Sequence, residues 1–302
     1  MRLVPLALLV LASAAWGASY VVAKVALQEI SPPLLAALRF SIAAAVLWLI
    51  LLARSRTTLP TRTDAARLIV LGAIGVGANG LLGYWGVSLT TATDAALLIV
   101  GEVLFTTLLA VLLIGERLSR LRMAALLVGL LGAIVLILGG AATSTPEAPA
   151  RALGDLLILC GLAFESAYTV LGTRLSRRYH PLSVLTISLS GSCLVWLPVI
   201  AFSARSGISL PSAGAIAGVL YLAVVTSVAC YLVWFGVLRK VGATLGALSL
   251  LAQPVVGAAL GILLLEEQPT LATLLGGACV VTCLVLASVR VRSAEPRTVA
   301  ET

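Results

Sequence analysis

The fold is encoded most clearly in two apolar stretches, LLIVGEVLFTTLLAVLLIGERLS (residues 97–119) and LSLLAQPVVGAALGILLLEEQPT (residues 248–270). Each stretch is about as long as a helix must be to cross a bilayer. Each carries a polar residue about a third of the way along, Glu102 or Gln253, and contains an acidic residue near its end, Glu116 or Glu267. The members of both pairs are 151 residues apart, so the chain of 302 residues is expected to consist of two copies of one unit.

The composition places this duplicated unit in a membrane. Hydrophobic residues make up 61% of the chain and charged residues 11%, whereas a soluble domain has about 45–50% and about 25%. A hydropathy window of about 19 residues divides the chain into apolar segments near 4–24, 33–53, 66–89, 94–114, 122–141, 153–173, 182–203, 213–237, 243–265 and 270–289. Because lipid cannot satisfy backbone polar groups, such segments must be helical. We therefore expect an all-α polytopic membrane protein with ten transmembrane helices, five in each copy.

The repeats and their connections can be placed on the chain. We expect the first five-helix repeat at residues 1–141 and the second at residues 153–290. Residues 142–152, rich in Pro, Ser, Thr and Ala, are expected to be an external linker, and residues 291–302 a cytoplasmic tail. The N-terminus resembles a secretory signal, but its removal would leave the first copy one helix short, so we expect it to stay as the first span.

Charge in the loops predicts the orientation of these spans. When the N-terminus is placed in the cytoplasm, the cytoplasmic side collects all of the 20 basic residues except Lys24, Arg39, Arg151 and Arg205. The positive-inside rule then predicts that both termini are cytoplasmic, in the inner (plasma) membrane of the cell. Since each copy has an odd number of helices, the second copy would enter the membrane from the opposite side. The expected architecture is therefore two inverted five-helix repeats.

Composition also argues against several classes of function. The net charge of +8 is dispersed among loops, which is not the pattern of a nucleic-acid-binding surface. The five cysteines fall inside apolar segments and the only histidine, His180, falls in a loop, so we expect no metal site. A Gly-rich loop followed by Lys and Ser or Thr, which would bind ATP, is not present in the sequence. We expect no cofactor.

The order of the motifs resembles the EamA-type members of the drug/metabolite transporter superfamily. The resemblance rests on WGASYVVAK in the first segment, ALRF in the second, GERLS after the fourth, FESAYTVLGTRL in the sixth and QPVVGAALGILLLEEQPT in the ninth. It covers nearly the whole chain and implies a transporter, with export as its direction. The family often has Glu-Pro in the fourth helix of each repeat, whereas this chain has Glu102-Val103 and Gln253-Pro254. Each copy keeps one half of the pair, so a mechanism that needs both acids is in doubt.

Polar and aromatic residues inside the spans are the candidates for a substrate site. Helical spacing places Trp16, Tyr20 and Lys24 on one face of the first helix, and Glu165 and Tyr168 on one face of the sixth. Together with residues of other spans they form our expected set of substrate-binding residues: Trp16, Tyr20, Lys24, Asn79, Tyr84, Glu102, Glu165, Tyr168, Tyr231, Trp234 and Gln253. Packing inside the bundle explains the aromatic residues nearly as well, and both readings stay open.

Small residues form a stripe on the third segment: Gly72, Gly75, Asn79, Gly83 and Gly86. Such a stripe allows another helix to approach closely, and Asn79 can form a hydrogen bond across that contact.

Charges within the bilayer are the sharpest candidates, because each costs roughly 2.5–3.5 kcal/mol on insertion scales. Glu165 and Glu102 lie deep in their spans, and we favour Glu165 for substrate contact or proton coupling. Lys24 and Arg39 are near helix ends and long enough to snorkel outward; Lys24 is either an anion contact or an interface anchor, and Arg39 is expected to be structural. Glu116 and Glu267 are expected to fix loop geometry, and Asp94 and Asp155 to complement helix N-termini.

The sequence thus favours a secondary transporter that moves amino acids, other small amphipathic metabolites or drug-like compounds through a central cavity between its two halves. We expect a monomer in the bilayer with a small-molecule substrate and no enzymatic chemistry. Proton coupling through Glu165 or Glu102 and facilitated diffusion without coupling both stay open. An intramembrane enzyme and a sensor or scaffold are the alternatives from other classes, and an importer or a sugar carrier are alternatives within transport.

Overall fold

The structure is a computed structural model that describes residues 3–54, 58–115, 119–141, 148–205, 211–241 and 249–288. Every regular element in these ranges is helical. Eight helices in the described part are long and apolar enough to cross a membrane, and two shorter apolar helices, Pro181–Trp196 and Ala252–Leu264, complete a set of ten. The prediction of an all-helical polytopic protein is confirmed. Glu116 and residues 142–147, 243–248 and 291–302, on which some sequence expectations rest, lie outside the described residues.

The first repeat contains five spans. They are α1 (Leu3–Ala26), α2 (Pro32–Ala53), a third span made of α3 (Arg62–Leu71), η1 (Gly72–Gly77) and α4 (Ala78–Leu89), a fourth made of α5 (Ala92–Leu97) and α6 (Val100–Ile114), and α7 (Arg120–Ala141). Local signals set several boundaries. Thr61 and Thr91 accept hydrogen bonds from the backbone N–H groups of Asp64 and Asp94, as N-cap residues do. Gly115, with φ of 73°, ends α6 in the left-handed conformation.

The second repeat follows the same plan. Its spans are α8 (Ala148–Arg178), α9 (Pro181–Arg205), a third span made of α10 (Ala213–Leu220), η2 (Tyr221–Ala229) and α11 (Cys230–Val241), then α13 (Ala252–Leu264) and α14 (Leu271–Ser288). The π-helical segments η1 and η2 occupy corresponding places in the third span of each repeat. Helix α8 begins at Ala148, so residues 148–152 of the expected linker are helical, with Pro149 in the first turn, where proline is tolerated.

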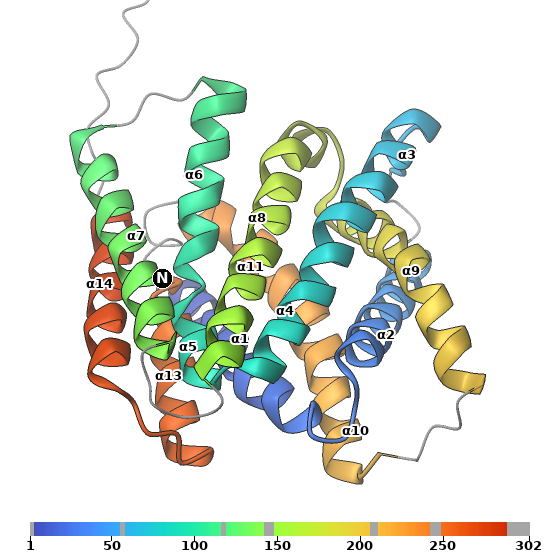
Figure 1. Cartoon of the computed structure of the whole chain (residues 1–302). Helices are drawn as coiled ribbons and strands as arrows, with labels where there is room; N and C mark the ends of the chain where they lie inside the picture. The colour runs from blue at the N-terminus through green and yellow to red at the C-terminus, as the bar shows by residue number, and fades with distance from the viewer. Residues whose placement is uncertain are drawn as a thin grey trace, which may run out of the picture.

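Helices of one repeat pack mainly against helices of the other. Helix α7 lies against α14 and α2 against α9, while α1 lies against α13 and α11, and α8 lies against α6 and α4. Corresponding helices of the two repeats therefore make corresponding contacts. In Figure 1, α3 begins near the top of the view and its counterpart α10 begins at the bottom.

Close approaches between backbones depend on the small residues of the third span. A Cβ atom added to Gly72 would lie 1.9 Å from the carbonyl oxygen of Ser188 in α9, and one added to Gly191 would lie 2.1 Å from that of Ile69. The Asn79 side chain donates across the neighbouring contact to Glu165 of α8. The stripe therefore packs the third span tightly against α8 and α9, as its spacing predicts.

The crossing at Gly72 yields a stability prediction. Gly72→Ala should destabilise the protein by about 1–3 kcal/mol, because the added methyl group meets backbone that cannot rotate away. Gly236→Ala in α11 is the control, since no atom of the described residues, apart from its chain neighbours and its own helix backbone, lies within 4 Å of the added Cβ. Thermal unfolding in detergent should show a lower midpoint for Gly72→Ala alone; equal midpoints would contradict the close crossing.

Candidate functional site

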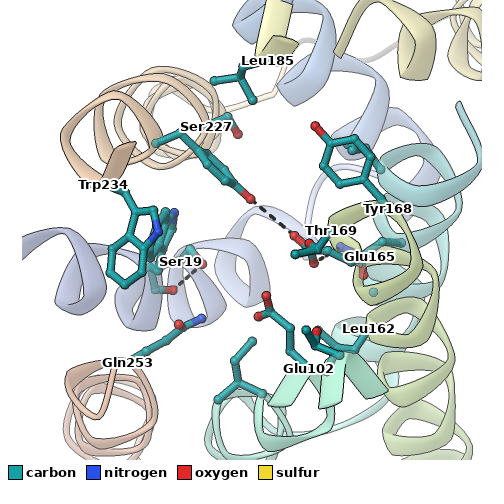
Figure 2. Close-up of a pocket in the computed structure, with 18 of the residues that line it drawn as sticks. Ser19, Glu102, Leu162, Glu165, Tyr168, Thr169, Leu185, Ser227, Trp234 and Gln253 are labelled. Carbon is teal, nitrogen blue, oxygen red and sulfur yellow. Dashed lines mark hydrogen bonds between the residues drawn. The ribbon is translucent and has the colours of Figure 1, made fainter. Parts of the chain in front are cut away.

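A cavity of about 930 Å³ lies between the two repeats. Polar and aromatic side chains from both repeats line it, including ten of the residues expected from sequence: Trp16, Tyr20, Asn79, Tyr84, Glu102, Glu165, Tyr168, Tyr231, Trp234 and Gln253. Figure 2 shows Glu102 and Glu165 projecting into the same space, with Trp234 on the opposite wall. The spacing in sequence therefore brought these side chains together as expected, although their contact with a substrate stays a prediction.

The fourth span of each repeat is interrupted beside this cavity. Leu98 and Ile99 separate α5 from α6, and turn residues precede α13. Corresponding backbone hydrogen bonds, each to the residue three positions earlier, form at both breaks. One runs from Glu102 N to Ile99 O and the other from Gln253 N to Leu250 O, both at 3.0 Å. Hydropathy predicted continuous spans here and missed both breaks. In transporters, interrupted helices at mid-membrane commonly mark the binding site.

The two half-buried acids of the cavity differ in their surroundings. Glu165 accepts a hydrogen bond of 2.7 Å from Asn79 Nδ2 and one of 3.3 Å from the Tyr231 hydroxyl. Within the described residues, the carboxylate of Glu102 has no hydrogen-bond or ion-pair partner, and no dashed line reaches it in Figure 2. Protein groups therefore already satisfy Glu165 in part, whereas Glu102 can take a partner from the cavity.

Aromatic rings form one wall. Trp16 lies edge-on to Tyr231, with ring centroids 5.3 Å apart, and its centroid is 5.6 Å from that of Trp234. The Trp16 indole nitrogen donates to the carbonyl of Thr226 at 3.0 Å, which fixes α1 to η2. Flat rings with polar edges suit an amphipathic organic solute.

Lys24 and Arg39 have different surroundings. Lys24 donates to the backbone carbonyls of Val87, Ser88 and Thr90, at the end of α4, and does not line the cavity. Arg39 lines the cavity and donates to Tyr84. Both side chains therefore have hydrogen-bond acceptors within the bundle.

Lys24 can be tested as a helix cap. Lys24→Gln should lower stability by about 1–3 kcal/mol, because it leaves carbonyl groups of α4 without their donor. The apparent KM for any transported solute should stay within about twofold, since Lys24 is off the cavity wall. Unfolding in detergent and transport in proteoliposomes measure the two effects. A large rise in KM with unchanged stability would contradict the capping role and show that Lys24 contributes to substrate binding.

The cavity extends toward one end of the bundle. Its lining includes Leu68, Tyr179, Pro181 and Val184, at the corner between α8 and α9 and the start of the third span. The lining at the other end is apolar: Ala23, Phe40, Val87, Ile99 and Ile158.

A hydrogen-bonded network closes the opposite end. Glu267, in the loop after α13, accepts from the backbone N–H groups of Ala92 and Thr93 at 2.6 and 2.8 Å, and from the Thr93 hydroxyl. It therefore caps α5 from the other repeat, and its carboxylate suits the positive end of the helix dipole. Glu267 fixes loop geometry, as expected, but across the boundary between the repeats.

Two further acids complete this closed end. Arg151 Nε lies 2.8 Å from Asp94 Oδ2, and Asp94 is 1% exposed. Asp155 is the eighth residue of α8 and is buried, where it accepts from Thr90. The expectation that Asp155 complements a helix N-terminus was wrong, because α8 begins earlier than hydropathy indicated. Both contacts join the first repeat to α8.

The loop between α1 and α2 adds an exposed contact at this end. Glu29 accepts from the backbone N–H and the hydroxyl of Ser212, both at 2.6 Å, where α10 begins. These hydrogen bonds lower the pKa of the Glu29 carboxyl from its ordinary value. The contact is therefore favoured above the ordinary carboxyl pKa and is weakened as pH falls through the lowered one.

In the part of the chain that the structure describes, ten apolar helices surround a polar and aromatic cavity, which is the architecture of a multi-pass membrane protein of the transporter class. The EamA-like transporter family model matches residues 3–138 and again residues 152–289. The chain therefore belongs to the EamA-like transporter family, with one family unit in each repeat.

Relatives and a solved structure agree with this assignment. The chain is 29% identical to the uncharacterized transporter YyaM of Bacillus subtilis (strain 168) over 80% of this chain and 79% of that protein. It is 26% identical to an uncharacterized transporter of Archaeoglobus fulgidus over 94% of this chain and 96% of that protein. A solved crystal structure shares the fold, with a TM-score of 0.63 and 22% identity, over 95% of this chain and 97% of that one.

Proposed function

We propose that this protein is a secondary transporter that exports small amphipathic metabolites, such as amino acids, or drug-like compounds across the inner (plasma) membrane. The single observation that carries the proposal is the Glu102 carboxylate, which faces a large aromatic cavity at a helix break without a protein partner among the described residues. A carboxylate in that position is suited to exchange between a proton and a cationic group of the solute.

The proposed mechanism is alternating access by two inverted halves. The positions of α3 and α10 at opposite ends of the bundle support the inversion (Figure 1). A cavity that reaches one end, and a network that ties the repeats together at the other, support a state with a single accessible side. Opening of the closed end would require Glu267 and Arg151 to leave their partners in the first repeat. Rocking of repeats around a central site is how such folds transport.

Coupling is assigned to Glu102. Glu165 has two donors of its own, so it is better suited to hold Asn79 and Tyr231 in place than to exchange protons. This proposal differs from the sequence-based preference for Glu165, because sequence alone does not show which acid the protein satisfies.

Purified protein in liposomes tests the proposal. Amino acids and organic cations are screened for uptake with and without a pH gradient, with protein-free liposomes as the control. We expect at least one solute to cross faster with protein, and its rate to depend on the gradient. If no solute crosses under any gradient, the transporter proposal is wrong. If a solute crosses at a rate that does not depend on the pH gradient, only the proposal of proton coupling is wrong.

A further inference from the structure

Arg39 in α2 is the only residue of the cavity wall, in the described part of the chain, that carries a fixed positive charge. Its guanidinium donates from Nε to Ser227 Oγ at 2.8 Å, from Nη1 to the Tyr84 hydroxyl at 2.6 Å and from Nη2 to Thr226 Oγ1 at 3.2 Å. All three acceptors are neutral hydroxyl groups. The charge itself is thus not neutralised by the groups that hold it.

No carboxylate of the described residues lies within ion-pair distance of this guanidinium. A guanidinium has five N–H donors, and in the described structure three interactions are made. The side chain is half-buried and borders the cavity, so its remaining donors can reach a ligand. The Glu165 carboxylate acts on the guanidinium only from beyond ion-pair distance. The cation is therefore only partly compensated, and an anion bound beside it in the cavity would offset the cost of its desolvation.

The surroundings hold the guanidinium in a fixed orientation. The hydroxyls of Thr226 and Ser227 both donate to the carbonyl of Leu222, at 2.6 and 3.0 Å, within the π-helical segment η2. Their lone pairs are therefore available to Arg39. Its guanidinium carbon also lies 5.1 Å from the ring centroid of Phe40 and 5.8 Å from that of Tyr84, distances at which a cation interacts with a ring.

We propose that Arg39 is a specificity-determining residue that binds the carboxylate of a zwitterionic solute, while the ammonium group of that solute meets Glu102. The proposal rests on the proposed transport function and names the charge pattern of its substrate. A planar guanidinium recognises a carboxylate through paired hydrogen bonds, which an uncharged amide cannot match. The site should therefore select solutes that carry both charges over monocations of the same shape.

Leucine and leucinamide test this selection, because they share the ammonium group and the apolar side chain and differ in the carboxylate. Both are measured in proteoliposomes, with protein-free liposomes to correct for leakage of the amide. The wild-type protein should transport leucine with a kcat/KM at least about 10-fold above that of leucinamide. Arg39→Gln should lower the value for leucine by about 10- to 100-fold and leave that for leucinamide within about twofold.

Two further variants keep the test decisive. Arg39→Lys retains the positive charge but loses the paired N–H donors of the guanidinium, so it should keep part of the preference for leucine. Arg120→Gln, which removes an exposed arginine at the start of α7, should change neither rate. If Arg39→Gln does not fold, the preference of the wild-type protein and of Arg39→Lys decides the question.

Each contrary result overturns a different claim. If kcat/KM falls equally for leucine and leucinamide in a folded Arg39→Gln protein, Arg39 only stabilises the position of η2, and the proposal is overturned. Equal wild-type transport of both probes, or transport of neither while other solutes cross, would also overturn it and leave the transport function standing. If no solute crosses at all, the transport function itself fails.

Discussion

Glu102→Gln should reduce solute transport in proteoliposomes by about 10- to 100-fold. A hydrogen bond to a charged group contributes about 1.5–3 kcal/mol, and about 1.4 kcal/mol corresponds to a factor of ten. Glutamine has nearly the same shape, so packing is kept while the charge and the proton-binding group are lost. Transport that remains should no longer depend on a pH gradient, because the substituted side chain cannot exchange a proton.

Glu165→Gln is the matched comparison for this result. Glutamine at this position keeps an oxygen that can accept from Asn79 Nδ2 or from the Tyr231 hydroxyl. We expect a loss of less than about 10-fold and a retained response to the gradient. If Glu165→Gln removes the pH response and Glu102→Gln keeps it, the roles assigned to the two acids are reversed.

Arg151→Gln should destabilise the protein by about 3–5 kcal/mol, the range found when one partner of a buried ion pair is removed. Asp94 is 1% exposed at its side chain and Arg151 is 16% exposed, so the remaining carboxylate would have little access to water. Thr273 donates to Asp94 but carries no charge. Thermal unfolding in detergent measures the effect.

The double variant Asp94→Asn with Arg151→Gln separates the ion pair from general packing. Neither side chain is then charged, so much of the lost stability should return. Arg67→Gln is the control at the other end of the bundle, where Arg67 pairs with Asp64 but is 64% exposed; it should change stability by less than about 1 kcal/mol. If the double variant is as unstable as Arg151→Gln, the charge on Asp94 is not the cause.

Sequence alone predicted the helical class and most span boundaries. A long apolar run in lipid must satisfy its backbone polar groups internally, which a helix does. It failed where a local feature interrupts a continuous pattern. Leu98 and Ile99 are ordinary apolar residues, so the break between α5 and α6 has no hydropathy signal; Gly101 beside them and Pro254 after the corresponding turn were the available hints.

The sequence predicted most of the residues that line the cavity but not the contacts that they make. Helical spacing brought Trp16, Tyr20 and Glu165 to one cavity, since residues on one face of a helix share their surroundings. Partners from distant segments cannot be read from such spacing. Arg39 was therefore taken as structural and Lys24 as a site residue, although in the structure only Arg39 lines the cavity.

The central claim is that one cavity between two repeats is accessible from one side at a time. Counterflow in proteoliposomes tests it most directly: liposomes loaded with an excess of unlabelled solute are diluted into a trace of the labelled solute. The account predicts that internal solute makes the label accumulate transiently above its external concentration, and that Glu102→Gln greatly reduces this effect. If the labelled solute enters at the same rate and to the same level with and without internal solute, as through an open pore, the account is contradicted.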